Sequence, residues 1–77
     1  MIDVTVNVSG SLRRFMPEGA AQVRLEVAEG TSAHHVINML GAQDEVWVIA
    51  INSVVVKATE TIKAGDSIHF FAPLQGG

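Results

Sequence analysis

The chain has 77 residues and no cysteine, and its eight acidic and five basic side chains give a net charge of −3. This length allows one domain with a small core, which buries about 60% of the surface that the unfolded chain exposes. The lack of cysteine excludes disulfides, a thiol nucleophile and thiolate metal sites. With 48% hydrophobic and 17% charged residues, the composition favours a folded chain over a disordered one.

Charge and hydropathy also limit the expected partners. Five basic residues are too few for a surface that follows phosphates, so we expect no binding to nucleic acid. Residues 1–5 lack the basic start and apolar run of a signal peptide. No apolar run has the length that a membrane span needs. We therefore expect a soluble cytoplasmic protein with no membrane partner.

Two segments near the N-terminus alternate between apolar and polar residues. In residues 2–8 the even positions are Ile or Val, and in residues 22–27 Val23, Leu25 and Val27 alternate with polar side chains. A period of two with β-branched residues predicts half-buried strands. We expect these two strands to pair antiparallel.

The segment between these strands contains punctuating residues. Residues 12–21 include Pro17 and Gly19, which are typical of a connecting loop. We expect Leu12 and Phe15 to lie under the edge of the sheet.

A short helix is predicted in the middle of the chain. Thr31 or Ser32 can cap it, because a hydroxyl oxygen there accepts a hydrogen bond from an early backbone N–H. Gly41 fits the left-handed position that follows a helix. The apolar stripe has the spacing i, i+3, i+4 and i+7 and consists of Ala33, Val36, Ile37 and Leu40. About ten residues of helix are not stable alone, so the helix must lie on the sheet.

Three further strands are predicted after the helix. Residues 46–51 form a continuous apolar run, which is typical of a central strand that is buried on both faces. Asn52-Ser53 forms a tight turn, and residues 54–56 return as the fourth strand.

The last strand follows a second turn. Residues 59–63 are a short connection with one helical turn, and residues 63–66 form a turn in which Gly65 supplies a permissive backbone and Asp66 closes the turn. In the strand over residues 67–72, Ile68 and Phe70 face one side, and His69 and Phe71 face the other.

The elements predict one α+β domain over residues 1–77. One helix covers only one face of a four- or five-stranded sheet, so we expect two layers with one sheet face open. An open face with aromatic side chains is a plausible docking surface, which here carries His69 and Phe71.

The five residues after the last strand are not explained by folding. They are Pro73, Leu74, Gln75, Gly76 and Gly77. Glycine loses the most conformational entropy when it is ordered, and a frayed end is the ordinary interpretation. However, Pro73 stiffens the exit from the strand, and two residues without side chains can enter a narrow channel in another protein. The Gly77 carboxylate at the tip is unhindered and can be activated as an acyl-adenylate.

The order of elements over essentially the whole chain resembles a known family, and the specific part of the resemblance is the C-terminal third. Residues 50–52 (Ala-Ile-Asn), 62–68 (Ile-Lys-Ala-Gly-Asp-Ser-Ile) and 70–77 (Phe-Phe-Ala-Pro-Leu-Gln-Gly-Gly) resemble the small β-grasp sulfur carriers. That family includes the small subunit of molybdopterin synthase and the carrier of thiamin-thiazole synthesis, both relatives of ubiquitin. The resemblance implies a β-grasp fold with a mixed sheet and a flexible tail over about residues 73–77.

The resemblance also implies a chemistry. An ATP-dependent activating enzyme adenylates the terminal glycine, here Gly77, and sulfur from a persulfide donor displaces AMP to leave a thiocarboxylate. Gly76 provides the thin approach, and Pro73, Leu74 and Gln75, with His69 and Phe71, contact the partner. The carrier itself is no enzyme and binds no cofactor or metal; it is a co-substrate, or the small subunit of a two-protein synthase. Its thiocarboxylate gives the sulfur to a biosynthetic intermediate on the larger synthase subunit or on a thiazole synthase.

Some alternatives stay open. The long connection over residues 9–21 favours the molybdopterin branch, because thiazole carriers join their first strands by a tight turn. The same tail, with no cleavable extension after Gly77, also suits a ubiquitin-like modifier that is joined to lysines. The third possibility is a plain β-grasp binding module.

Several other side chains have ordinary interpretations. His34 and His35 are adjacent on the helix and diverge, whereas metal pairs on helices are spaced i, i+4. Trp47 is interpreted mainly as a core residue. Arg13 and Arg14 are either solvated or paired with an acidic partner, and Asp44-Glu45 lie on a polar connection with no nucleophile.

Overall fold

The alternating segments near the N-terminus form a hairpin of two antiparallel strands, as predicted. In the computed structural model, which describes residues 1–46 and 48–72, these strands are β1 (Ile2–Val8) and β2 (Gln22–Val27). They pair from Ile2 with Val27 to Asn7 with Gln22. The branched side chains at even positions of β1 point into the core, where Val4 and Val6 are completely buried.

The connection between β1 and β2 is more regular than the predicted loop. It forms two 3₁₀ helices, η1 (Gly10–Phe15) and η2 (Pro17–Gly19). Pro17 stands at the start of η2, where its fixed φ is compatible with a helical turn. Leu12 is 1% exposed and Met16 is 4% exposed, so both side chains belong to the core. The prediction that Leu12 lies under the sheet is confirmed, and Phe15 is half-buried against the same core.

The predicted helix forms as α1 (Ala33–Leu40). The Ser32 side chain accepts a hydrogen bond from the backbone N–H of His35, and Gly41 adopts a left-handed conformation with φ of 78°. Both predicted ends are therefore confirmed. Ala33, Val36 and Ile37 are buried, which places the apolar stripe of α1 on the sheet.

The next two strands form a second hairpin. They are β3 (Val48–Ile51) and β4 (Val54–Val56), joined at Asn52 and Ser53, which have φ of 51° and 71°. Two positive φ values are typical of a two-residue hairpin turn that matches the strand twist. The predicted tight turn is confirmed. The strand β3 begins at Val48, and Trp47 lies outside the described residues.

The connection after β4 contains no helical turn, so that prediction was wrong. Residues 57–62 instead run beside the start of α1, where Ser32 and Thr61 form an isolated bridge. The backbone N–H groups of Ala33 and His34 donate to the carbonyls of Glu60 and Ala58. The first N–H groups of a helix have no partner within the helix, and this segment, which contains a hydrogen-bonded turn from Lys57 to Glu60, provides two acceptors.

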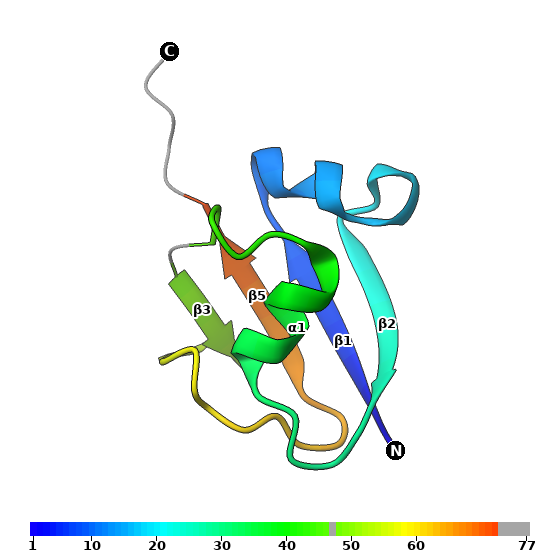
Figure 1. Cartoon of the computed structure of the whole chain (residues 1–77), viewed down its shortest axis with the longest axis vertical. Coiled ribbons are helices and arrows are strands. Elements are labelled where there is room, and N and C mark those ends of the chain that lie inside the picture. The colour runs from blue at the N-terminus through cyan, green and yellow to red at the C-terminus, as the bar shows by residue number, and fades with distance from the viewer. Residues whose placement is uncertain (47, 73–77) are drawn as a thin grey trace.

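The last strand, β5 (Ser67–Phe71), lies in the centre of the sheet, in the order β2-β1-β5-β3-β4. It is parallel to β1 and antiparallel to β3 (Figure 1). The strand β3 has a neighbour on each side, as predicted. It begins at Val48 and not at residue 46, and Val48 is 41% exposed, so the predicted burial on both faces does not hold along the whole strand. The predicted turn before β5 is also confirmed, with Gly65 at φ of 81°.

The result is the predicted two-layer α+β arrangement with five strands. The helix α1 lies across one face of the sheet (Figure 1). Between the two layers lie the largest completely buried side chains: Phe70, Leu12, Ile62, Ile68, Val4, Val6 and Val36. No helix in residues 1–46 and 48–72 is long and apolar enough to cross a membrane.

Candidate functional site

The strand β5 presents different side chains to the two faces of the sheet. Ile68 and Phe70 are buried in the core, whereas His69 is half-buried and Phe71 is 39% exposed. Successive residues of a strand point to opposite faces. His69 and Phe71 therefore lie on the face that α1 does not cover, as the sequence predicted.

Neighbouring strands add apolar side chains on this open face. In the sheet register Val48 is opposite Phe71, and Ala50 is opposite both His69 and Val55. Val48 is 41% exposed and Val55 is 72% exposed. We call these five residues the apolar patch: Val48, Ala50, Val55, His69 and Phe71.

The aromatic part of the apolar patch is ordered by a ring stack. The His69 and Phe71 rings have centroids 6.0 Å apart and planes inclined by 16°, a separation at which aromatic pairs still attract each other. Ala50 lies directly across from His69 and is only 7% exposed. The exposed apolar side chains of the patch are therefore Val48, Val55 and Phe71.

The other half of the open face is polar. Gln22 Nε2 donates to Asn7 Oδ1 at 2.7 Å, and Asn7 Nδ2 donates to Ser67 Oγ at 3.2 Å. These bonds cross β2, β1 and β5, and they border the apolar patch. The side chains of β1 and β2 on this half are Asp3, Thr5, Asn7, Gln22, Arg24 and Glu26.

A charged pair lies near the end of β5. The 3₁₀ helix η1 contacts β5, and its Arg14 Nη2 lies 2.6 Å from Glu45 Oε1. The Arg14 guanidinium also lies 4.6 Å from the centroid of the Phe15 ring. Arg13 Nε donates to the carbonyl of Gly19 at 2.9 Å. Both arginines therefore have partners within the chain. These contacts were not predicted from the sequence.

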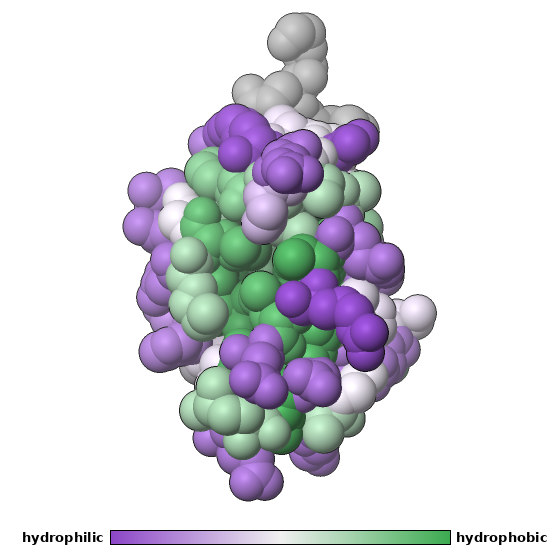
Figure 2. All heavy atoms as spheres, turned by 90° about the vertical axis from the view of Figure 1, so that its right-hand side faces the viewer, coloured by the Kyte–Doolittle hydropathy of each residue, from purple (hydrophilic) through white to green (hydrophobic). Residues whose placement is uncertain are grey.

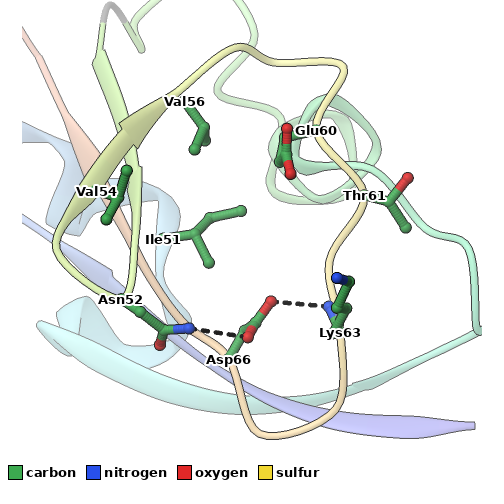
Figure 3. Close-up of a pocket in the computed structure, with 8 residues that line it drawn as sticks. All are labelled: Ile51, Asn52, Val54, Val56, Glu60, Thr61, Lys63 and Asp66. Carbon is green, nitrogen blue, oxygen red and sulfur yellow. Dashed lines mark hydrogen bonds between the residues drawn. The ribbon is translucent and has the colours of Figure 1, made fainter.

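Hydrogen bonds join the two turns whose sequences resemble those of the sulfur carriers. Asn52 Nδ2 donates to Asp66 Oδ1 at 3.0 Å, and Asn52 Oδ1 accepts from the Ser67 N–H at 3.0 Å. Asp66 Oδ2 accepts from the Lys63 N–H at 2.8 Å, so Asp66 closes its turn as predicted. Figure 3 shows how Asp66 lies between Asn52 and Lys63. This Asn52–Asp66 bridge fixes the β3–β4 hairpin relative to the start of β5.

A hollow opens beside the Asn52–Asp66 bridge (Figure 3). Both Asp66 oxygens already accept hydrogen bonds, so the carboxylate serves the turn. The hollow is lined by Ile51, Asn52, Val54, Val56, Glu60, Thr61, Lys63 and Asp66.

The histidines of α1 lie on its outer face. His34 and His35 are both exposed, and His34 Nε2 lies 3.2 Å from Asn38 Nδ2. Within residues 1–46 and 48–72, no three His, Asp or Glu side chains are grouped as a metal site requires.

The remaining predicted site residues follow the last described one. Ala72 is half-buried against the core. The residues Pro73, Leu74, Gln75, Gly76 and Gly77 lie outside the described part of the chain. The proposed reacting position at Gly77 and its approach therefore stay predictions.

A family model described as the ThiS family matches residues 6–77. No curated protein matches the chain.

Solved structures share the fold at low sequence identity. A protein from Pyrococcus furiosus described as molybdopterin converting factor subunit 1 is 24% identical, with 96% of this chain and 100% of that chain covered and a TM-score of 0.77. Small archaeal modifier protein 1 of Haloferax volcanii is 18% identical, with coverages of 96% and 100% and a TM-score of 0.77. Urm1 from Trypanosoma brucei is 14% identical, with coverages of 97% and 95% and a TM-score of 0.70. These likenesses confirm the β-grasp, ubiquitin-like fold.

Proposed function

The chain belongs to the ThiS family, and from this membership we propose that it is a sulfur carrier that reacts at the Gly77 carboxylate. The observation that supports the proposal most is the extent of the match, residues 6–77, which includes the Gly76-Gly77 pair. Because Gly76 and Gly77 have no side chains, both fit a channel that excludes bulkier residues.

The proposed chemistry takes place on the carboxyl group. A Gly77 oxygen attacks the α-phosphorus of ATP on an activating enzyme, and pyrophosphate leaves. Sulfur from a persulfide donor then attacks the acyl carbon and displaces AMP. A thiol then attacks the donor sulfur of the acyl disulfide, forms a disulfide with the donor, and releases a thiocarboxylate at Gly77. The carrier is a co-substrate in this scheme, and ATP is bound by the activating enzyme.

The apolar patch is proposed as the docking surface for the activating enzyme and for the larger synthase subunit. Its exposed side chains, Val48, Val55 and Phe71, lie on one face of the sheet. Aromatic residues are enriched at the centres of protein interfaces. The patch includes the end of β5 at Phe71, so a partner bound there lies near the start of the tail.

The molybdopterin pathway is proposed over the thiazole pathway. The support is the long connection between β1 and β2, which forms η1 and η2 and contributes Leu12 and Met16 to the core. It therefore replaces the tight turn of the thiazole carriers with a packed segment.

The experiment that tests the carrier function is a measurement of intact mass. The protein is incubated with a ThiS-family activating enzyme, ATP and a persulfide donor. The expected mass increase equals the exchange of one oxygen for sulfur, and it disappears without ATP. An unchanged mass with activating enzymes of both pathways would contradict the proposal.

A modifier function is the second candidate. It is favoured by the likeness to small archaeal modifier protein 1, whose name describes that protein as a modifier. In the same incubation with cell extract, adducts between Gly77 and lysine side chains of other proteins would support it. Thiocarboxylate without such adducts would support the carrier alone.

A further inference from the structure

The strand β2 is an edge strand with a long free side. It stands at the end of the strand order and at the margin of the sheet in Figure 1. The Val8 N–H donates to the Ala21 carbonyl at 3.0 Å, and antiparallel ladders alternate between bonded and non-bonded pairs. The backbone groups of Val23, Leu25 and Val27 therefore face β1, and those of Gln22, Arg24 and Glu26 face outward.

The side chains along this edge are apolar on one face and charged on the other. Val23 and Leu25, on the helix side, are only half-buried. Figure 2, which views the molecule from the side on which β2 lies, shows an elongated apolar strip bordered by hydrophilic side chains. Arg24 and Glu26 lie on the open face, and within the described residues neither has an ion-pair partner. Glu26 is directly opposite Asp3, and like charges in this position repel each other.

We propose that two copies of this chain pair antiparallel through their β2 strands, with Leu25 opposite Leu25 of the second copy. In this register Arg24 is opposite Glu26 of the second copy, and Glu26 is opposite Arg24 of the second copy. Val23 is opposite Val27 of the second copy in the same way. Each strand thus meets opposite charges on the open face and apolar side chains on the helix face.

The neighbouring registers are less favourable. A shift by one residue between the strands places an open-face side chain against a helix-face side chain. Registers centred on Arg24 or on Glu26 place like charges against each other. In a register centred on Val23, Glu26 lies beyond Arg24 and Glu26 of the second copy and therefore has no charged partner. Only the register centred on Leu25 pairs every charge and relieves the repulsion between Glu26 and Asp3.

The backbone groups agree with the same register. Arg24 and Glu26 both direct their N–H and carbonyl groups outward, so they form the hydrogen-bonded pairs, and the two copies exchange four such bonds. The product is a continuous ten-stranded sheet. The apolar patch lies on β3, β4 and β5 at the far side of each copy, so the pairing leaves it free. The inference is therefore independent of the proposed function.

The strength of this pairing is limited by its small size. A contact through one short strand falls below the area of standard interfaces, where complexes are weak and transient. We therefore expect a dimer whose population rises steeply with protein concentration.

Exchange of the charges at Arg24 and Glu26 tests the proposed register between the two β2 strands. Sedimentation velocity over a concentration series measures the dissociation constant of the natural protein and three variants. Arg24→Glu and Glu26→Arg each convert both charge pairs into like pairs, and each is expected to weaken the dimer by at least about tenfold. The double variant R24E/E26R restores opposite pairs and is expected to dimerise like the natural protein.

The control is Glu60→Arg, which makes the same change of charge as Glu26→Arg away from β2 and leaves the dimer intact. Because all of these side chains are exposed, circular dichroism is expected to show the same fold throughout. A natural protein that stays monomeric at millimolar concentration would overturn the proposal, and so would single variants that dimerise normally.

Amide hydrogen exchange tests the strand that is used. The N–H groups of Arg24 and Glu26 are expected to become protected as protein concentration rises, and this protection is lost in Arg24→Glu. The N–H groups of Val23 and Leu25 bond to β1 and stay protected at every concentration. A dimer in which Arg24 and Glu26 exchange freely would show that another surface is used.

Discussion

Asn52 combines an uncommon backbone conformation with two side-chain hydrogen bonds. Its φ is 51°, in the left-handed region that asparagine tolerates better than most residues. Its amide donates to Asp66 and accepts from Ser67. Asn52 thus defines the β3–β4 turn and connects it to β5 through Asp66 and Ser67.

The first prediction separates these two contributions. Asn52→Ala removes both hydrogen bonds and strains the backbone, so we expect a loss of about 2 kcal/mol in the free energy of unfolding. Asn52→Gly removes the bonds but relieves the strain, so the loss should be about 1 kcal/mol. Urea unfolding measures both values. Equal losses would show that the backbone conformation contributes nothing.

The second prediction uses two adjacent exposed valines that point to opposite faces. Val55 belongs to the apolar patch, whereas Val54 lines the hollow on the helix side. Val55→Lys places a charge in the proposed interface and is expected to lower kcat/KM for adenylation at least about tenfold. Val54→Lys is the matched control, because lysine is common on edge strands, and should leave the rate unchanged. Equal effects of the two variants would contradict docking through the open face.

The sequence predicted only part of this surface. Because successive side chains of a strand point to opposite faces, the sequence did predict that His69 and Phe71 share a face. Val48 and Val55 were not predicted, because a continuous apolar run contains no alternation to show which side chains face out. Their orientation depends on the register across β3, β4 and β5. The pair of Arg14 with Glu45 was missed because it joins residues 31 positions apart.

At the scale of elements, the connection between β1 and β2 differs most from its prediction. Glycine and proline are typical of loops, yet η1 and η2 use them to form short 3₁₀ turns. Local composition does not reveal that Leu12 and Met16 reach the core. In contrast, α1 was predicted well because its cap, its stripe and its final glycine all indicate the same boundaries.

The third prediction tests whether this connection supports the fold. Leu12→Ala removes a side chain that is 1% exposed, so we expect a loss of about 2–5 kcal/mol in the free energy of unfolding. Ser11→Ala, at an exposed neighbouring position, is the control and should change stability by less than about 0.5 kcal/mol. Thermal unfolding compares the two variants. If the Leu12→Ala protein were as stable as the Ser11→Ala protein, η1 would connect β1 to β2 without stabilising the fold.

At the scale of the whole molecule, the residues that form the core are different from those proposed to carry the chemistry. The described core lies between α1 and the sheet, and the residues predicted to react follow Ala72. Residue patterns predicted the layers and the open face well, because one helix covers one face. They did not predict the central place of β5, since strand order depends on long-range pairing.

The fourth prediction follows from this separation. Deletion of Gly77 is expected to abolish thiocarboxylate formation and to leave the melting temperature unchanged, because the core of the described residues does not use it. Ser11→Ala, an exposed change outside the predicted partner-binding residues that keeps the carboxyl end, should retain the reaction. A large fall in melting temperature on deletion would contradict the separation of core and tail.

The central position of β5 also has a consequence for the order in which the chain folds. The β1–β2 and β3–β4 hairpins share no direct strand pairing, and β5 joins them. A two-stranded hairpin is at best marginally stable alone. During synthesis, the sheet therefore cannot close until β5 has left the ribosome. The apolar patch takes two of its residues, His69 and Phe71, from β5, so the proposed docking surface forms only after β5 has been synthesised.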